Sequence, residues 1–326
     1  MKPDLINYLQ CNQCSSDFLI KENEKIKDEI INGSLICKHC RVEVPISRSI
    51  PRFVNLKTIE TKATAKAFGY EWKKFRKITD YYENQFLEWI FPVKPSFFKN
   101  KVVLDAGCGK GRHIIQSAKF GAKKIIGIDI GEAIDVAYEN TKEFDNVHLI
   151  QADIHNPPLM GSSLDYIYSV GVIHHINSPE IAVSKLANLL SNGGHLSLWL
   201  YGAENNEWIV KFINPIRIHL TSKMSPDNLK DLCYAFGLLL HTYCKFFYKS
   251  ILTNWLSDKL FYADYMKNIS DFSYIENVSI LFDHLIAPTA RYYSNNKAKE
   301  LAARDGLKLL EINWCHKNSW SLFLLK

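Results

Sequence analysis

A glycine-rich turn after an apolar run is the feature that most constrains how this chain can fold. The run 102–104 (Val-Val-Leu) has the character of a buried strand, and the turn after it places Gly107, Gly109 and Gly111 at alternate positions. A helical pattern begins directly after the third glycine. Such a strand, turn and helix bring the backbone close to a ligand at the carboxyl end of a sheet. Several nucleotide-binding folds use related glycine patterns, so the turn alone does not name the ligand.

Apolar strands alternate with amphipathic helices from residue 101 onward. The pattern predicts strands near 102–104, 124–128, 147–150, 164–169 and 195–200, and helices near 110–120, 132–143 and 179–191. Alternation at this spacing indicates an α/β fold with a parallel sheet covered on both faces. The rhythm breaks over 204–290 and resumes with a helix at 295–305 and strands at 308–314 and 320–325. We therefore divide the chain into residues 1–55, 56–100 and 101–326, with 204–290 as a helical insertion.

The first 55 residues contain two Cys-x-x-Cys pairs, Cys11 with Cys14 and Cys37 with Cys40. Two such knuckles facing each other form the tetrahedral thiolate site of a zinc ribbon. Two redox-active pairs are the alternative, but these usually open a helix in a thioredoxin-like βαβ pattern, which this segment lacks. We expect structural zinc, because a closed four-thiolate site leaves no open position for catalysis.

The bulk composition excludes few classes of protein. Forty basic residues against 34 acidic residues give a formal net charge of +6, which is mild for a nucleic-acid-binding chain. No run approaches the roughly 20 apolar residues of a membrane span, and the first residues lack a secretory signal. These observations predict a cytoplasmic protein without a membrane span, and they leave its oligomeric state open.

The segment 104–113 (Leu-Asp-Ala-Gly-Cys-Gly-Lys-Gly-Arg-His) resembles motif I of the class I S-adenosylmethionine-dependent methyltransferases. Four further segments resemble this family's later motifs and occur in the expected order: 127–130, 151–154, 164–175 and 189–194. The resemblance covers residues 101–200, with weaker agreement over 295–326. It implies a Rossmann-like, seven-stranded methyltransferase sheet, preceded here by a zinc ribbon like that of Trm112.

The resemblance implies where the cofactor S-adenosylmethionine binds. In the family, the residue at Asp129 binds both ribose hydroxyls and the residue at Asp153 accepts from the adenine amino group. A dehydrogenase would also use Asp129 but would leave Asp153 without a role. For Asp105 and Asp153, helix capping or turn chemistry is the alternative. The expected cofactor-binding residues are Tyr70, Asp105, Ala106, Gly107, Cys108, Gly109, Asp129, Ile130, Asp153, Ile154, Ser169 and Gly171.

Two histidines follow the fourth strand, where the family places residues near the transferred methyl group. His174 or His175 can deprotonate an acceptor, because histidine titrates near neutral pH. The alternative is that one histidine caps the next helix while the other packs against the sheet. Tyr70 lies in a Phe-Gly-Tyr-x-Trp segment that covers the cofactor in relatives, or it belongs to a helix that packs on the core.

The expected acceptor is an oxygen or nitrogen of a small molecule, such as a sugar or a secondary metabolite. The aromatic insertion at 204–290 would choose this substrate. An RNA methyltransferase that grips rRNA or tRNA with its ribbon is one alternative, and a non-catalytic, cofactor-binding scaffold is another. Residues 17–48 of the ribbon carry six basic and six acidic residues, which does not favour RNA, so nucleic acid is an unlikely partner.

Overall fold

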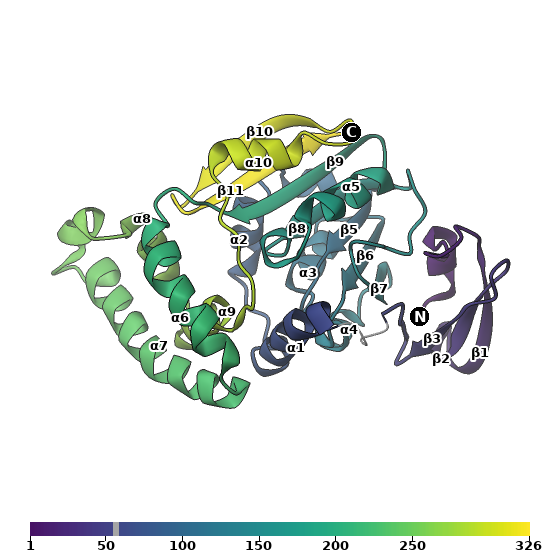
Figure 1. Ribbon diagram of the computed structural model, residues 1–326, viewed down its shortest axis with the longest axis horizontal. Helices are drawn as coiled ribbons and strands as arrows, with labels where there is room; N and C mark the ends of the chain where they lie inside the picture. The colour runs from purple at the N-terminus through teal and green to yellow at the C-terminus, as the bar shows by residue number, and fades with distance from the viewer. Residues whose placement is uncertain (55–58) are drawn as a thin grey trace.

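The computed structural model describes residues 1–54 and 59–326. Two sheets organise the chain: a four-stranded sheet near the N-terminus and a seven-stranded sheet in the centre (Figure 1). A helical layer lies on the other side of the large sheet from the ribbon, beside the carboxyl ends of its strands, so that the N-terminal sheet and this layer flank the centre. In the described parts of the chain, no helix is long and apolar enough to span a membrane.

The small sheet has the order β1-β2-β3-β4 and is antiparallel throughout. Its strands are β1 (Phe18–Ile26), β2 (Glu29–Cys37), β3 (Glu43–Ser47) and β4 (Ile50–Pro51). A short 3-10 helix, η1 (Pro3–Tyr8), precedes it. Leu5, Leu9 and Phe18 belong to the same apolar core as Leu164 and the helix that follows it, so this ribbon is packed onto the central domain.

The large sheet has the order β10-β11-β9-β8-β5-β6-β7, and the predicted seven-stranded α/β fold is therefore confirmed. Its strands are β5 (Val102–Ala106), β6 (Lys124–Asp129), β7 (Val147–Gln151), β8 (Leu164–Val170), β9 (Leu190–Tyr201), β10 (Lys308–Cys315) and β11 (Ser319–Leu325). β5 to β9 run parallel, and β11 pairs antiparallel with both β9 and β10. The carboxyl ends of the parallel strands thus meet at one edge of the sheet.

Helices cover both faces of the large sheet because its buried residues alternate between two cores. The flanking helices are α2 (Tyr82–Trp89), α3 (Arg112–Lys119), α4 (Ala133–Thr141), α5 (Pro179–Leu189) and α10 (Asn295–Ala302). Val103 and Ile125 pack with α2, α3 and α4, whereas Leu104 and Ile126 pack with α5, α10 and the ribbon. This alternation explains why the strands are apolar along their whole length.

The end of the ribbon pairs with β7, the edge strand of the large sheet. Arg52 forms a parallel bridge with Gln151 of β7, and the Phe53 amide donates to the Gln151 carbonyl at 2.8 Å. On the other side of the ribbon, Leu9 forms an antiparallel bridge with Leu159. The small sheet is therefore joined by backbone hydrogen bonds to the part of the large sheet that carries Asp153.

The insertion forms a helical layer beside the carboxyl edge of the large sheet (Figure 1). Its helices are α6 (Asn214–His219), α7 (Pro226–Lys249), α8 (Ala263–Ile269) and α9 (Tyr274–Ile286), with the 3-10 turn η6 (Asn254–Lys259) between α7 and α8. α1 (Ile59–Lys74) lies against α4 and α9, so it connects the insertion to the sheet domain.

Candidate active site

The glycine turn between β5 and α3 has the conformation that its sequence predicts. Gly107 and Gly109 have φ values of 91° and 51°, in the left-handed region that favours glycine. A Cβ on Gly107 would lie 2.3 Å from Val172 Cγ2, and one on Gly109 would lie 3.0 Å from Trp72 Nε1. The turn therefore needs glycine both for its backbone angles and for the close packing of its neighbours. Gly107, Cys108 and Gly109 line a cavity of about 460 Å³.

Asp129 ends β6 and faces the same cavity. Its Oδ2 accepts a hydrogen bond from the Gly109 amide at 2.9 Å, and its Oδ1 accepts one from the Gly131 amide at 2.8 Å. Burial raises the pKa of this carboxyl, while the two amides partly oppose that shift. The two backbone bonds fix the carboxylate in one orientation and leave lone pairs for a pair of hydroxyl groups.

Asp153 lies beyond the end of β7 and is bound by His155, a residue that the sequence did not single out. Asp153 Oδ1 accepts from the His155 amide at 2.9 Å and lies 2.7 Å from His155 Nδ1. His155 Nε2 lies 2.6 Å from the Asn177 carbonyl oxygen, so both ring nitrogens face acceptors. The hydrogen bond to Asp153 raises the pKa of His155, and this arrangement suits the imidazolium, which donates from both nitrogens. Although burial opposes it, the bonds from His155 lower the pKa of Asp153.

Four of the sequence-predicted cofactor residues do not line the cavity. Asp105 is buried beneath the turn, and among the described residues neither of its carboxylate oxygens has a hydrogen-bond partner. The Ser169 hydroxyl donates to the Ala106 carbonyl at 2.8 Å, which joins β8 to β5. The Tyr70 hydroxyl contacts Asp227 of α7. The expected lining residues Gly107, Cys108, Gly109, Asp129, Ile130, Asp153, Ile154 and Gly171 all surround the cavity.

Tyr70 faces the insertion instead of the cofactor loop because α1 packs against α9. The Tyr70 ring stacks on Phe282 at 5.8 Å between centroids. Trp72, two residues later in the same helix, does line the cavity and contacts Gly109. The Phe-Gly-Tyr-x-Trp segment therefore contributes its tryptophan to the site and its tyrosine to the packing of the insertion.

The structure separates the two histidines that follow β8. His174 is fully buried, stacks on Tyr201 at 3.9 Å between ring centroids and does not line the cavity. His175 does line it, and its Nδ1 lies 2.6 Å from the Thr289 carbonyl oxygen. Burial lowers the pKa of His175, so the ring is neutral near pH 7 with its proton on Nδ1. That tautomer leaves Nε2 as an acceptor, which is the state of a general base.

Arg112 is the first residue of α3, and its side chain lines the cavity. Its guanidinium lies over the rings of Trp72, Tyr82 and Trp89, at 5.5, 5.2 and 5.3 Å from their centroids. Among the described residues, no carboxylate forms an ion pair with it within 4.0 Å. The aromatic rings hold the cation in place and leave it available to an anionic group in the cavity.

The insertion contributes acidic and aromatic groups to the far wall of the cavity. Glu276 of α9 accepts a hydrogen bond from the Tyr82 hydroxyl at 2.9 Å, and burial raises its pKa to about 7. Glu71 is completely buried nearby, and burial raises its pKa as well. Tyr81 stacks on Phe272 with ring centroids 4.5 Å apart. These residues come from segments about 200 positions apart, so their proximity could not be read from local patterns.

The four ribbon cysteines converge on one point. Their sulfur atoms all lie within 4.8 Å of one another, with Cys11 and Cys40 at 3.6 Å and Cys14 and Cys37 at 3.4 Å. Tetrahedral zinc with Zn–S bonds of about 2.3 Å places its sulfurs about 3.8 Å apart. The cluster can therefore hold a zinc ion with all four thiolates, as the sequence predicted.

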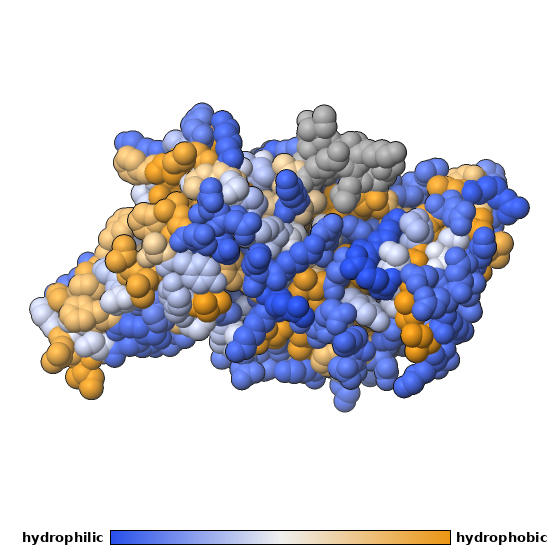
Figure 2. All heavy atoms as spheres, turned by 90° about the horizontal axis from the view of Figure 1, so that it is seen from below, coloured by the Kyte–Doolittle hydropathy of each residue, from blue (hydrophilic) through white to orange (hydrophobic). Residues whose placement is uncertain are grey.

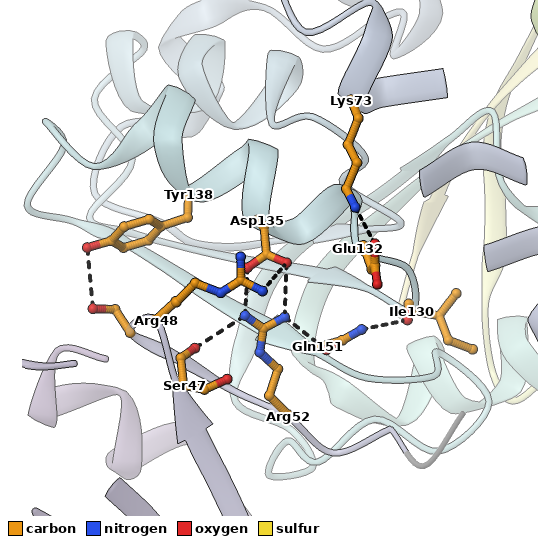
Figure 3. Close-up of polar contacts among 10 residues, drawn as sticks. Ser47, Arg48, Arg52, Lys73, Ile130, Glu132, Asp135, Tyr138 and Gln151 are labelled. Carbon is orange, nitrogen blue, oxygen red and sulfur yellow. Dashed lines mark hydrogen bonds and ion pairs between the residues drawn. The ribbon is translucent and has the colours of Figure 1, made fainter. Parts of the chain in front are cut away.

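A polar network links the ribbon to the cofactor side of the sheet (Figure 3). Arg52 Nη2 lies 2.6 Å from Asp135 Oδ1 of α4, and Arg52 Nη1 donates to Gln151 Oε1 at 3.0 Å. Gln151 Nε2 in turn donates to the Ile130 carbonyl at 3.1 Å. Because Ile130 directly follows Asp129, this chain of bonds connects the ribbon with the loop that follows β6 at the cavity.

Comparison with protein-family models matches residues 97–226 to the model described as "Methyltransferase domain". This segment contains the glycine turn, Asp129, Asp153 and both histidines. Residues 97–226 form a methyltransferase domain. They contain β5 to β9, five of the seven strands of the large sheet, and the match and the strand order agree with the fold of class I, S-adenosylmethionine-dependent methyltransferases.

The curated relatives match only part of this chain. A tRNA U34 carboxymethyltransferase of Psychromonas ingrahamii is 34% identical over 118 residues, which cover 34% of this chain and 36% of the relative. The enzyme of the same name from Shewanella oneidensis is 31% identical over 151 residues, which cover 39% and 45%. The chain thus spans less than half the length of these relatives.

Among solved structures, magnesium protoporphyrin IX methyltransferase of Synechocystis with bound S-adenosylmethionine aligns with a TM-score of 0.47 and 12% identity. The alignment covers 84% of this chain and 100% of that structure.

The sequence-based expectation of a small-molecule acceptor, with nucleic acid as an unlikely partner, is wrong. The curated relatives overturn it, because they are named for action on tRNA.

Proposed function

We propose that this protein is an S-adenosylmethionine-dependent methyltransferase whose acceptor is RNA, with tRNA as the substrate class to test first. The observation that carries this proposal is the 34% identity over 118 residues with an enzyme named for action on tRNA. The methyltransferase domain and the cavity beside its glycine turn support the transfer activity. A tRNA acceptor also implies a cytoplasmic location.

The charges around α1 support an RNA acceptor, whereas the charges of the ribbon are balanced. One face of α1 lines the cavity through Ala65, Phe68 and Trp72. Exposed basic side chains lie on the rest of this helix and just after it: Lys66, Lys73, Lys74, Arg76 and Lys77. Lys73 contacts Glu132, as Figure 3 shows. Positive groups beside an aromatic cavity fit a phosphate backbone whose base enters the cavity.

The cavity walls suit a base that has left its stack. Trp72, Tyr81, Trp89 and Phe272 line the cavity, and such rings bind bases by stacking. Enzymes that modify a base must bring it into a pocket of this kind. Arg112, held by the rings, can bind an anionic group that enters with the cofactor or the nucleotide.

The assignments of individual residues follow from their positions around the cavity. We assign the ribose hydroxyls to Asp129, the adenine amino group to Asp153, and close approach of the cofactor to Gly107 and Gly109. S-adenosylmethionine supplies an activated methyl group, so the protein mainly aligns the acceptor with it. His175, neutral and with Nε2 free to accept, removes the proton from the acceptor.

The ribbon contributes structure in this proposal, with zinc bound by Cys11, Cys14, Cys37 and Cys40. Residues 1–55 would be the ribbon, 56–100 a linking region that partly covers the cofactor, and 101–326 the methyltransferase domain with its insertion at 204–290. The backbone bonds between Phe53 and Gln151 support a ribbon that is a fixed part of the enzyme.

Labelled methyl transfer to unmodified bulk tRNA tests the function directly. We expect label in the tRNA fraction that ribonuclease removes, and mass analysis of the nucleosides then identifies the added group and separates methyl from carboxymethyl. Label in a small-molecule fraction alone would refute the RNA acceptor. Calorimetric titration with S-adenosylhomocysteine tests cofactor binding separately, and a protein that fails to bind it is no methyltransferase.

A further inference from the structure

The outer face of α7 is apolar where a surface helix is normally polar. The inner face of α7 buries Leu229, Cys233 and Cys244 against α9. Turning about half a circle around the helix brings Leu238, Leu239 and Phe246 to the surface, and all three are more than half exposed. A soluble helix usually places charged residues there. α7 thus has two apolar faces, and only one of them is covered within the described chain.

The turn after α7 extends this apolar face to the end of the insertion. Ile251 and Leu252 are 95% and 80% exposed, and Trp255 of η6 is 69% exposed. The Trp255 indole N–H donates to the Leu252 carbonyl at 3.1 Å, so the tip has a defined shape. We call Leu238, Leu239, Phe246, Ile251, Leu252 and Trp255 the apolar tip.

Further exposed apolar residues lie on the neighbouring segment around α6. They are Val210, Phe212, Ile216, Ile218 and Leu220. Figure 2 shows hydrophobic residues gathered over the insertion side of the molecule, whereas the face over the sheet domain and ribbon is mostly hydrophilic. Exposed apolar surface on this scale marks an interaction site in a monomeric fold.

Basic residues outnumber acidic ones in this region, whose carboxylates are Asp227, Asp231 and Asp258. Residues 208–226 and 232–257 contain no aspartate or glutamate. They do contain exposed lysines, including Lys211, Lys223, Lys245 and Lys249. Lys249 contacts Asp271 of a neighbouring turn, and Lys245 donates to the Ser270 carbonyl at 2.8 Å. Apolar side chains, a tryptophan and flanking lysines are the composition of a segment that lies in the interface of an anionic bilayer.

We infer that the apolar tip docks the insertion onto an anionic lipid surface. The exposed aliphatic side chains enter the boundary of the acyl chains, Trp255 lies at the headgroup level, and the lysines face the lipid phosphates. The occupant is a bilayer surface and not a second copy of this chain. Two copies paired through the tip would bring lysines opposite lysines, because Asp227 and Asp231 lie at the start of α7 beside Lys230, and Asp258 lies beside Lys267.

This inference goes beyond the transfer of a methyl group to RNA and does not rest on it. The insertion lines the cavity with Tyr262, Tyr265 and Phe272, while the apolar tip lies at its outer end. Docking through the tip would therefore hold the cavity wall at a fixed distance from the membrane. A membrane-spanning helix is not needed for such peripheral binding.

Vesicle co-sedimentation tests the inference with the full-length protein and no acceptor. One set of vesicles is pure phosphatidylcholine, and the other contains phosphatidylglycerol. We expect at least ten-fold stronger binding to the anionic set, and loss of that binding in the variant Ile251→Ser/Leu252→Ser/Trp255→Ser. The matched control is Ile26→Ser in the ribbon, which is 58% exposed and lies outside the insertion. It should bind vesicles like the wild type.

Two results would overturn the inference. One is equal sedimentation with both vesicle types, or binding that the triple variant retains. The other is a concentration-dependent increase in molecular mass, measured by light scattering, that the triple variant abolishes, since this would make the tip an interface between two copies. Thermal unfolding and binding of S-adenosylhomocysteine should be unchanged in the triple variant, because its three residues are exposed and lie away from the cofactor loop.

Discussion

Arg52 of the ribbon and Asp135 of α4 form an ion pair, with Nη2 and Oδ1 2.6 Å apart and both side chains mostly buried. The same guanidinium donates to Gln151 at 3.0 Å, and Gln151 donates to the carbonyl of Ile130 beside Asp129. This single arginine therefore connects the ribbon, α4 and the loop after β6 that lines the cavity.

Replacing Arg52 with alanine should lower both stability and cofactor affinity. The variant loses charge-assisted hydrogen bonds to Asp135 and Gln151, and we expect the free energy of unfolding to fall by about 2 kcal/mol. Affinity for S-adenosylhomocysteine should fall several-fold, because Gln151 is no longer held against Ile130. Denaturant unfolding and calorimetric titration measure the two effects.

Arg48 provides the matched control for Arg52. It lies 3.4 Å from the same aspartate, but its side chain is 74% exposed, against 12% for Arg52. Exposed ion pairs contribute little, so Arg48→Ala should change the free energy of unfolding by less than about 0.5 kcal/mol. Equal losses in the two variants would show that burial of the pair is unimportant.

Asp129→Ala should weaken binding of S-adenosylhomocysteine by at least about a hundred-fold, since a carboxylate that receives two ribose hydroxyls contributes two charge-assisted hydrogen bonds. The fold should survive, because the backbone amides of Gly109 and Gly131 can turn to water. Circular dichroism checks the fold and titration checks the affinity. Glu132→Ala, in the same loop but on the surface, should bind as the wild type does. Wild-type affinity in Asp129→Ala would refute the ribose assignment.

The two histidines after β8 should differ sharply in their effect on turnover. His175→Phe removes the Nε2 acceptor, and we expect kcat to fall by about 10²- to 10⁴-fold. His174→Phe should keep most of the activity, because His174 already stacks on Tyr201 as an aromatic ring without hydrogen-bond partners among the described residues. Single-turnover rates on tRNA distinguish them, and a reversed order would reassign the base.

The same assignment predicts the pH dependence of the reaction. Burial lowers the pKa of His175, so the base is already neutral at pH 7. The rate should therefore be flat through neutral pH and fall only when acidification protonates the ring. A rate that still rises between about pH 6.5 and 8 would point to a base with an ordinary or raised pKa.

His155 should make the free energy of unfolding depend on pH above neutrality. Its hydrogen bond to Asp153 raises its pKa above the unfolded value of about 6.5. The stabilisation is fully present below that unfolded value and is lost as the pH rises through the raised folded value. The free energy of unfolding of the wild type should thus decline above neutral pH, and His155→Gln should flatten that decline. Urea titrations at several pH values measure it, and identical slopes would exclude the pair.

Zinc should contribute to the fold of the ribbon and hence of the whole chain. Structural zinc provides on the order of 10 kcal/mol of binding free energy in small domains. Cys11→Ser/Cys14→Ser should abolish the bound metal and expose Leu5 and Leu9 of the shared core. Elemental analysis of the purified protein checks the metal, and proteolysis checks the ribbon. Unchanged zinc content in the double variant would contradict the site.

Local patterns predicted the parts of the fold that depend on local chemistry. The glycine turn has left-handed backbone angles that few other residues adopt, and Asp129 and Asp153 follow directly from buried apolar strands. The four cysteines were equally clear, because their spacing matches tetrahedral geometry. The glycine turn and each Cys-x-x-Cys pair are contained within about ten residues, so their neighbours in sequence largely define them.

The rest of the site depends on contacts between distant segments. Arg112 meets Trp72 and Trp89 only because α1 and α2 fold back over the glycine turn, and Glu276 meets Tyr82 across 194 positions. Which histidine faces the cavity depends on the single 3-10 turn Ile173–His175. The expectation of a small-molecule acceptor has a related cause: the ribbon has balanced charges, whereas the exposed basic side chains beside the cavity lie on α1 and just after it.

The backbone pairing of Arg52 with Gln151 also covers part of β7, the edge strand of the large sheet. An uncovered edge strand offers unpaired amides and carbonyls to any other extended chain, which makes it a template for aggregation. Here the ribbon pairs with the end of β7 at Gln151, whose carbonyl accepts from the Phe53 amide. The ribbon therefore covers the carboxyl end of this edge strand, and a chain shortened by its first 55 residues would leave that end open to pairing with another chain.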